Sequence, residues 1–199
     1  EAEARALNPG FLKRMEHGLP YVRVKLAMSL DGRTAMASGE SQWITGPAAR
    51  SAVQRLRARS SIVLTSAESV LADNARMTVR ADELNLDAET TALALARPPL
   101  RVLIDGRLRL ALDAAFFQAG PALVVTAAPD DACYAAAGHE LLSLPGSDGR
   151  VDLPALVREL ARRGANDVLV EAGPRLAGAF AQLGLVDEYQ IFIAGKFLG

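Results

Sequence analysis

Short runs of continuously apolar residues recur along this chain and alternate with longer stretches of helical pattern. The runs cover residues 21–30, 61–66, 100–105, 122–128, 167–173 and 188–197. A strand that is apolar throughout is buried on both faces, which is typical of parallel sheets covered by helices. The alternation therefore predicts an α/β protein whose central sheet is mostly parallel and is flanked by helices.

Helix signals lie between these runs. They predict helices over residues 44–60, 151–164 and 174–184. Prolines such as Pro47 and Pro174 fit the first helical turn, where a missing N–H costs nothing. Residues 67–80 are polar and are interpreted as a loop. Residues 81–99 are acidic and rich in alanine, which indicates a surface excursion with some helix.

The composition limits the class of protein. The 199 residues carry a formal net charge of −1 and 50% are hydrophobic, so we expect a single domain and no nucleic-acid partner. One cysteine, Cys133, and two histidines, His17 and His139, predict neither a disulfide framework nor a metal site. There is no apolar run of about 18 residues and no signal peptide, so we expect a cytoplasmic protein with no membrane segment.

Glycine and other small residues follow one of the predicted strands. Glu171 ends this strand, Gly173 turns the chain and Pro174 opens the next helix, whose first turns include Ala177 and Gly178. Accessible backbone amides at a helix N-terminus attract phosphate. The stretch has neither the lysine of a nucleotide-triphosphate P-loop nor a G-x-G-x-x-G motif. The pattern alone favours equally a tight turn whose small residues serve packing.

A second polar junction lies within residues 65–80. Ser69 offers a hydroxyl, and Asp73 is suited to orienting an amide or assisting proton transfer. Arg76 and Arg80 are suited to phosphate, which arginine binds with two parallel hydrogen bonds. The alternative for the whole stretch is a solvated loop with an Asx-turn.

The third polar stretch holds the one tryptophan of the chain. Ser41 and Trp43 stand in a glycine-punctuated loop, and Arg57 lies on the helix that follows. A flat apolar ring beside a hydroxyl suits a ligand slot. The alternatives are a ring folded back onto the core and an arginine on a solvated helix face.

Together, residues 24–46, 70–80 and 170–199 resemble the reductase domain of the bifunctional deaminase/reductase of riboflavin biosynthesis. The resemblance implies a dihydrofolate-reductase-like α/β sandwich that acts as a homodimer. It implies NADPH as the cofactor and a phosphorylated pyrimidine substrate, 5-amino-6-(5-phosphoribosylamino)uracil, whose ribosyl group is reduced to a ribityl chain.

The resemblance assigns site residues position by position. Substrate contacts match Ser41, Arg57, Arg76, Met77, Arg80 and Glu171. Cofactor contacts match Ala27, Trp43, Ser69, Asp73, Gly106, Gly173, Pro174, Arg175, Leu176, Ala177, Gly178 and Ala179. Asp73 and Glu171 are the candidates for catalytic proton transfer, with solvent as the alternative, and Lys25 is a weaker candidate for the site.

Some positions depart from the family pattern. Gly106 stands where many members have a serine that reads the 2′-phosphate of NADPH, a contact that Arg107 or Arg109 would then have to supply. Residues 1–20 resemble the family's interdomain segment and 21–199 the reductase domain, without the final strands of other members. The H-x-E and P-C-x-x-C motifs of the zinc deaminase are absent, so that domain is expected elsewhere in the full-length chain, with a stand-alone reductase as the alternative.

Two other functions stay open from the sequence. One is a dihydrofolate-reductase-like enzyme with a different substrate. The other is a binding or oligomerisation module that keeps the fold without turnover.

Overall fold

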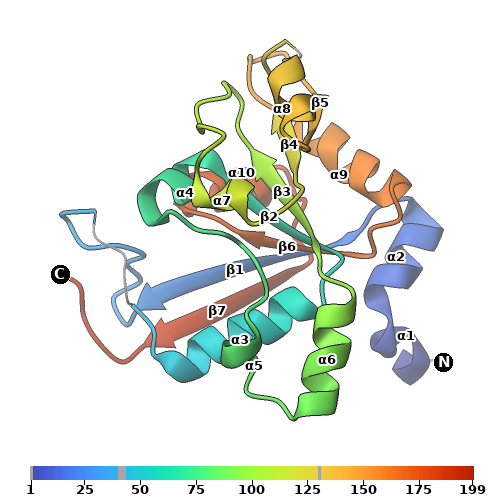
Figure 1. Cartoon of the computed structure of the whole chain (residues 1–199). Helices are drawn as coiled ribbons and strands as arrows, with labels where there is room; N and C mark the ends of the chain where they lie inside the picture. Colours follow the sequence, from blue (N-terminus) through green and yellow to red (C-terminus); the bar gives the residue numbers. More distant parts are fainter. Residues whose placement is uncertain (1, 40–43, 130) are drawn as a thin grey trace.

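The computed structural model describes residues 2–39, 44–129 and 131–199, and within them one sheet of seven strands (Figure 1). Its strands are β1 (Tyr21–Ser29), β2 (Ile62–Ser66), β3 (Leu100–Ile104), β4 (Leu123–Thr126), β5 (Glu140–Ser143), β6 (Asp167–Glu171) and β7 (Glu188–Ala194). All neighbouring strands run parallel, in the order β5-β4-β3-β2-β6-β1-β7.

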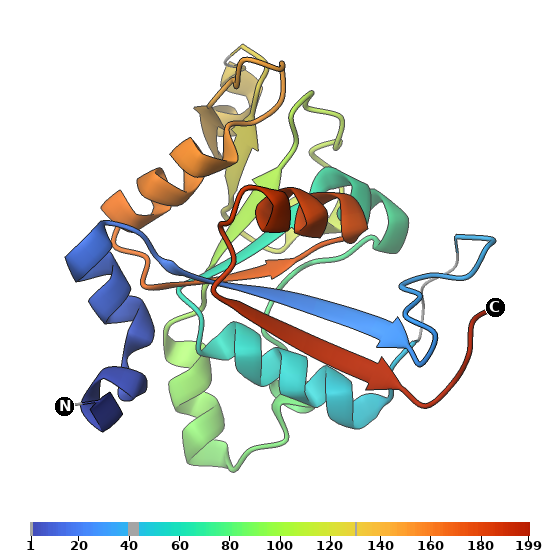
Figure 2. The same ribbon diagram turned by 180° about the vertical axis from the view of Figure 1, so that it is seen from behind.

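Helices precede the first strand, connect the strands and cover the sheet. They are α1 (Ala2–Leu7), α2 (Pro9–His17), α3 (Pro47–Ala58), α4 (Ala67–Asp73), α5 (Ala81–Leu84), α6 (Ala88–Ala96), α7 (Ala115–Gln118), α8 (Ala132–Ala136), α9 (Leu153–Arg162) and α10 (Pro174–Gln182). Figure 1 looks onto the face that carries α4 and α7, and Figure 2 onto the face that carries α9 and α10.

Each face of the sheet has its own hydrophobic core. Leu156 and Leu160 of α9 and Phe180 of α10 pack on one face. Leu56 of α3 and Val70 of α4 pack on the other, together with α7 and α8. Because successive strand residues point to opposite faces, covering both faces requires strands that are apolar throughout. This explains the continuous apolar runs of the sequence and confirms the predicted parallel sheet.

The interpretation of residues 67–80 as a loop is wrong for its first half, which forms α4. Ser66 caps this helix by accepting a hydrogen bond from the backbone N–H of Ser69, and Ala67 and Val70 are buried against the sheet. Asn74 ends the helix in the left-handed conformation. The polar residues that suggested a loop are therefore the cap and the exposed face of a short helix.

The sequence patterns also miss several short elements. They predict no strand at β5, which adds to the edge of the sheet beside β4, and no helix at α2. β5 has only four residues, so its periodicity carries little information. The predicted helices within 44–60, 151–164 and 174–184 are confirmed, as is helix within 81–99, where α5 and α6 lie.

The packing of α10 predicts the cost of removing its central side chain. Phe180 is fully buried between α10 and the sheet. Phe180→Ala should lower the free energy of unfolding by about 3–5 kcal/mol, measured by urea denaturation, because it leaves a cavity. Leu183→Ala is the matched control, since Leu183 ends the same helix and is 52% exposed. Equal losses in the two variants would contradict this packing.

Candidate functional site

A buried ion pair joins α3 to the end of β6. Arg57 Nε donates to Glu171 Oε1 over 2.6 Å and Arg57 Nη2 to Oε2 over 3.0 Å. The side chains are only 12% and 8% exposed. Arg57 is held further by bonds from Nη1 to the carbonyl of Thr78 (2.9 Å) and from Nη2 to Met77 Sδ (3.7 Å). Two residues that the sequence placed at a common site are therefore in direct contact.

The pair keeps both side chains charged. Burial by itself would raise the pKa of Glu171, but the charge and hydrogen bonds of Arg57 outweigh it and hold that pKa below its ordinary value. The charges of Lys25 and Arg80 act in the same direction. Burial would likewise lower the pKa of Arg57, and the charge of Glu171 raises it instead. Glu171 is therefore a carboxylate across the neutral range.

Lys25 extends this charged site across the sheet. It lies opposite Glu171 on one side and Gln190 on the other, so the three side chains point to the same face. The Lys25 ammonium lies 5.9 Å from the centre of the Phe192 ring. Lys25, the weaker candidate from the sequence, is thus beside the ion pair.

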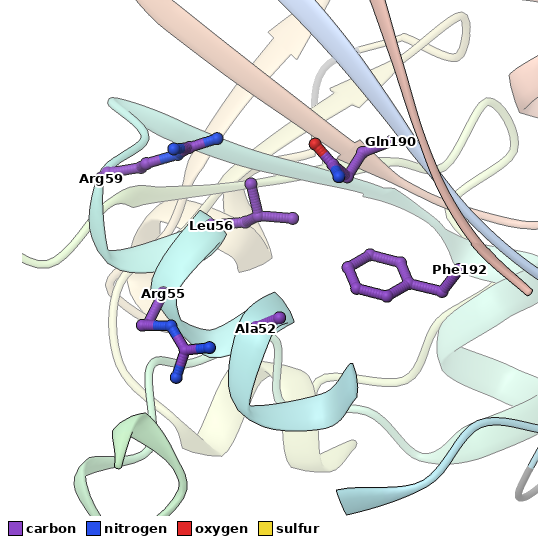
Figure 3. A pocket seen from close by; sticks show the side chains of 6 residues that line it. All are labelled: Ala52, Arg55, Leu56, Arg59, Gln190 and Phe192. Atoms are coloured by element: carbon purple, nitrogen blue, oxygen red, sulfur yellow. The ribbon is translucent and has the colours of Figure 1, made fainter. Parts of the chain in front are cut away.

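A hollow of about 370 Å³ opens next to Lys25 and Gln190, between α3 and β7 (Figure 3). Its apolar lining includes Leu56 and Phe192, and its polar lining Arg55, Arg59 and Gln190. Phe192 therefore lines the hollow and also lies beside Lys25. The site and the hollow share this wall.

The turn after α4 is held in an unusual backbone conformation. Met77 has a φ of 57°, in the left-handed region that few residues other than glycine adopt, and its side chain is buried. Arg57 donates a hydrogen bond to the carbonyl of Thr78, the next residue, and Arg101 Nη1 donates to the carbonyl of Arg76 over 3.1 Å. Hydrogen bonds on both sides of Met77 thus offset the strain of about 1 kcal/mol or more.

Arg80 is fixed at the end of the same turn. Its backbone N–H donates to Gln54 Oε1 over 3.0 Å, and its guanidinium pairs with Glu83 over 2.8 Å. Gln54 also donates to Glu83. The Arg80 side chain stays 46% exposed, in contrast to the enclosed Arg57.

A second cluster links the loops that follow β2 and β6. The Gly173 N–H donates to Ser69 Oγ over 3.1 Å, and Ser69 in turn lies 3.1 Å from Ser66 Oγ. On the surface, Arg175 pairs with Glu68 over 2.9 Å. The two polar junctions of the sequence therefore meet at the carboxyl edge of the sheet, as expected for parallel strands.

The glycines of this second cluster do not serve packing. A Cβ atom built on Gly178 meets no described atom within 4 Å, and one built on Gly173 approaches only Ser69 Oγ, at 4.0 Å. Neither glycine has a positive φ. No side chain of the described residues caps α10. The two glycines thus give no support to the packing alternative, although Ala177 between them is buried against the sheet, and the backbone at Gly173 and Gly178 is open to a ligand.

Among the remaining predicted residues, Pro174, Leu176 and Ala179 belong to α10, and the others lie as follows. Ala27 shares the sheet face of Lys25, Asp73 ends α4 with an exposed side chain, and Gly106 follows β3. Ser41 and Trp43 lie outside the described residues, so their predicted roles stay predictions.

The sequence missed two residues that hold the site together. Gln54 is buried and fixes Arg80, and Arg101 is buried, stacks on the Phe116 ring and fixes the Arg76 carbonyl. A signal existed in both cases, namely a polar residue within an otherwise apolar helix face or strand. The partners, however, lie 25 or 26 positions away in the sequence.

Two negative findings concern only residues 2–39, 44–129 and 131–199. These residues contain no group of three or more His, Cys, Asp or Glu side chains arranged to hold a metal ion. None of the helices they form has both the length and the hydropathy of a membrane span.

Comparisons with known proteins identify relatives of the whole chain. Residues 20–199 match the family described as RibD C-terminal domain. The riboflavin biosynthesis protein RibD of Escherichia coli (strain K12) is 47% identical over 202 residues, covering 100% of this chain and 54% of the relative. The chain thus spans about half the length of the curated relatives it matches.

Solved structures agree with these relatives. Acinetobacter baumannii RibD, form 1, has a TM-score of 0.83 at 43% identity, covering 98% of this chain and 52% of that one. A diaminohydroxyphosphoribosylaminopyrimidine deaminase/5-amino-6-(5-phosphoribosylamino)uracil reductase from Thermotoga maritima has a TM-score of 0.80 at 29% identity, covering 100% and 51%. Such neighbours confirm the dihydrofolate-reductase-like fold. The chain therefore belongs to the family of RibD C-terminal domains.

Proposed function

We propose that this chain reduces 5-amino-6-(5-phosphoribosylamino)uracil to its ribitylamino product with NADPH. The observation that carries the proposal is the buried pair of Arg57 and Glu171 beside Lys25, at the edge of the sheet where the open backbone of α10 begins. Family membership supports the same reaction. A charged site next to an open helix N-terminus suits a polar substrate that reacts with a phosphate-containing cofactor.

The residues present fit such a cofactor. The bare backbone at Gly173 and Gly178 leaves room for a pyrophosphate, and the N-terminus of α10 offers amides without a side-chain cap among the described residues. Ser69 Oγ accepts a hydrogen bond from the Gly173 N–H, so Ser69 fixes the loop before α10 and occupies this one amide. When bound, NADPH would supply the hydride for the reduction.

In this proposal, the preference for NADPH over NADH comes from arginines in the loop after β3 and at the start of α10. Gly106 removes the serine hydroxyl expected from the family pattern. Arg107 and Arg109 follow on the same loop and are exposed, so either is available to a 2′-phosphate. Arg175, at the start of α10, adds a third guanidinium, which pairs with Glu68 of α4.

Glu171 accepts hydrogen bonds and stabilises positive charge in this proposal. Because Arg57 keeps it ionised, it is unsuited to donate a proton at neutral pH. A carboxylate beside the reacting carbon would stabilise the cationic imine form of the substrate. The proton is then left to Asp73 or to solvent, the other candidates from the sequence.

Arg57 and Arg80 have different roles toward the substrate in this proposal. Contacts within the protein occupy four of the five N–H donors of the Arg57 guanidinium. The contacts of Arg57 with other described residues therefore leave one donor for substrate, and Arg57 mainly positions Glu171 and the Met77 turn. Arg80 is the more exposed of the two and is the better phosphate ligand.

We further propose a cytoplasmic homodimer with a zinc deaminase domain in the same full-length chain. The half-length match to RibD proteins supports the second domain. Tyr189, Ile191 and Ile193 support the dimer, since they form an exposed apolar row, 49%, 45% and 62% accessible, on β7 at the sheet edge.

Turnover is the direct test. With NADPH and the phosphoribosylaminouracil, the absorbance of reduced nicotinamide should fall, and Arg80→Ala should raise KM for the substrate about tenfold by removing a phosphate contact. Arg158→Ala on the exposed face of α9 is the matched control and should leave KM unchanged. An unaffected KM in Arg80→Ala favours a reductase of another substrate. Cofactor binding without turnover favours the non-catalytic module.

The ion pair predicts a pH-dependent stability difference. Glu171→Gln leaves the buried Arg57 charge without its partner and should lower the free energy of unfolding by about 3–5 kcal/mol at pH 7. Because the folded pKa of Glu171 is depressed, its stabilisation is complete above the ordinary glutamate pKa of about 4.3 and is lost as pH falls through the folded value. Urea denaturation at several pH values should therefore show that the difference in free energy of unfolding between the wild-type protein and Glu171→Gln becomes smaller in acid.

Glu159→Gln is the control for this comparison. Glu159 also binds two arginines, Arg162 and Arg163, but on the surface of α9. Its replacement should cost less than about 1 kcal/mol. Losses of similar size in the two variants would show that burial does not strengthen the Arg57–Glu171 pair.

Gly178 predicts opposite effects on stability and on cofactor binding. Gly178→Ala should stabilise α10 by about 0.5–1 kcal/mol, because alanine favours the helix and its methyl group meets open space. The same methyl group should weaken NADPH binding, measured by fluorescence titration, if the cofactor approaches the backbone there. A stabilised variant with unchanged NADPH affinity would contradict the proposed cofactor site.

A further inference from the structure

Helix α2 packs with its polar side inward. Surface helices ordinarily turn apolar residues to the core and polar ones to solvent. Here Lys13 pairs with Asp187 over 2.6 Å, and Arg14 Nε donates to Asn166 over 2.7 Å. Both partners lie at the amino end of the sheet, before β7 and β6. The helix is therefore attached to the domain through charges and hydrogen bonds.

The attachment is close enough to fix the position of the helix. A Cβ atom at Gly10 would lie 2.7 Å from the carbonyl oxygen of Asn166, so only glycine allows this approach. Arg5 and Glu16 pair over 2.7 Å and tie α1 to α2. Residues 2–17 thus form an ordered helical pair on the end of the sheet (Figures 1 and 2).

The outward side of this pair is apolar. Leu7, Phe11 and Met15 are 78%, 47% and 62% exposed. Phe11 and Met15 are four residues apart on α2 and therefore share one face of it. We call these three side chains the N-terminal apolar face. Apolar side chains that gather on the exposed side of a helix are typical of a surface that binds a partner.

The comparisons indicate which partner lies there. The matched family is the C-terminal domain of RibD and its match begins at residue 20, just after α2. The Escherichia coli relative covers the whole of this chain, α1 and α2 included, and is nearly twice as long. In such a protein α1 and α2 lie at the junction between the two halves.

We propose that the N-terminal apolar face is the docking surface for a preceding domain of the full-length protein, so that α1 and α2 form a rigid interdomain contact. This proposal rests on the architecture proposed above, a deaminase domain in the same chain. The partner surface is an apolar patch that buries Phe11 and Met15. A second copy of the chain is the competing occupant.

The test compares the full-length protein with a protein of residues 1–199. The amides of α2 should exchange hydrogen more slowly in the full-length protein, because docking suppresses local opening of the helix. Phe11→Ser with Met15→Ser should speed protease cleavage within residues 1–20 of the full-length protein about tenfold. His17→Ser, an exposed polar position on the same helix, is the matched control.

Each result has one meaning for the proposal. Slower exchange in the full-length protein, with faster cleavage only in the double variant, supports it. Equal exchange in the two proteins, or equal cleavage of the double variant and the control, overturns it. Sedimentation that shows a dimer of residues 1–199 abolished by the double variant assigns the face to a second copy and also overturns it. NADPH turnover by residues 1–199 should be unchanged in both variants, so a failure of the proposed reaction would be seen separately.

Discussion

The contact between Arg57 and Glu171 is the interaction on which the site depends. It joins α3 to the end of β6. Two further hydrogen bonds from Arg57 reach Met77 and Thr78 of the turn after α4. An ion pair so enclosed is costly to desolvate, and it adds stability only where geometry and further hydrogen bonds compensate. The parallel bonds to the carboxylate and the bond to Thr78 supply that compensation. The pair therefore fixes the charge of Glu171 and the conformation of the turn together.

The order of the strands makes this contact possible. β6 lies between β1 and β2, although it follows β1 by about 140 residues and β2 by about 100 in the chain, and this places Glu171 between Lys25 and the start of α4. Since all the described strands are parallel, the loops after β2 and β6 leave the sheet at the same edge. The bond between Ser69 and Gly173 joins these loops directly. The residues proposed to bind substrate and cofactor are thus positioned by the same strand order.

Stability and ligand binding place different demands on the same elements. Phe180 and Ala177 of α10 are buried against the sheet, whereas Gly178 between them contributes no side chain and leaves the surface bare. The strained φ of Met77 is another feature that packing alone does not require. In α2 the polar side makes the packing contacts and the apolar side stays exposed, which indicates a partner rather than a core. Such departures from ordinary packing mark the surfaces at which ligands or other domains are expected.

The sequence by itself determined the architecture, because apolar runs and helix signals report burial, and burial on both faces requires a parallel sheet covered by helices. Its motifs also selected the residues of both clusters, through resemblance to a family in which those positions are recognisable. It did not determine that α4 is a helix, since serine, aspartate and asparagine serve caps and loops alike. Nor did it show that Arg57 is largely occupied by Glu171, or that Gln54 and Arg101 support the site. Those contacts join residues 25 or more positions apart, and only the folded chain decides which distant polar groups meet and which charges remain free for a ligand.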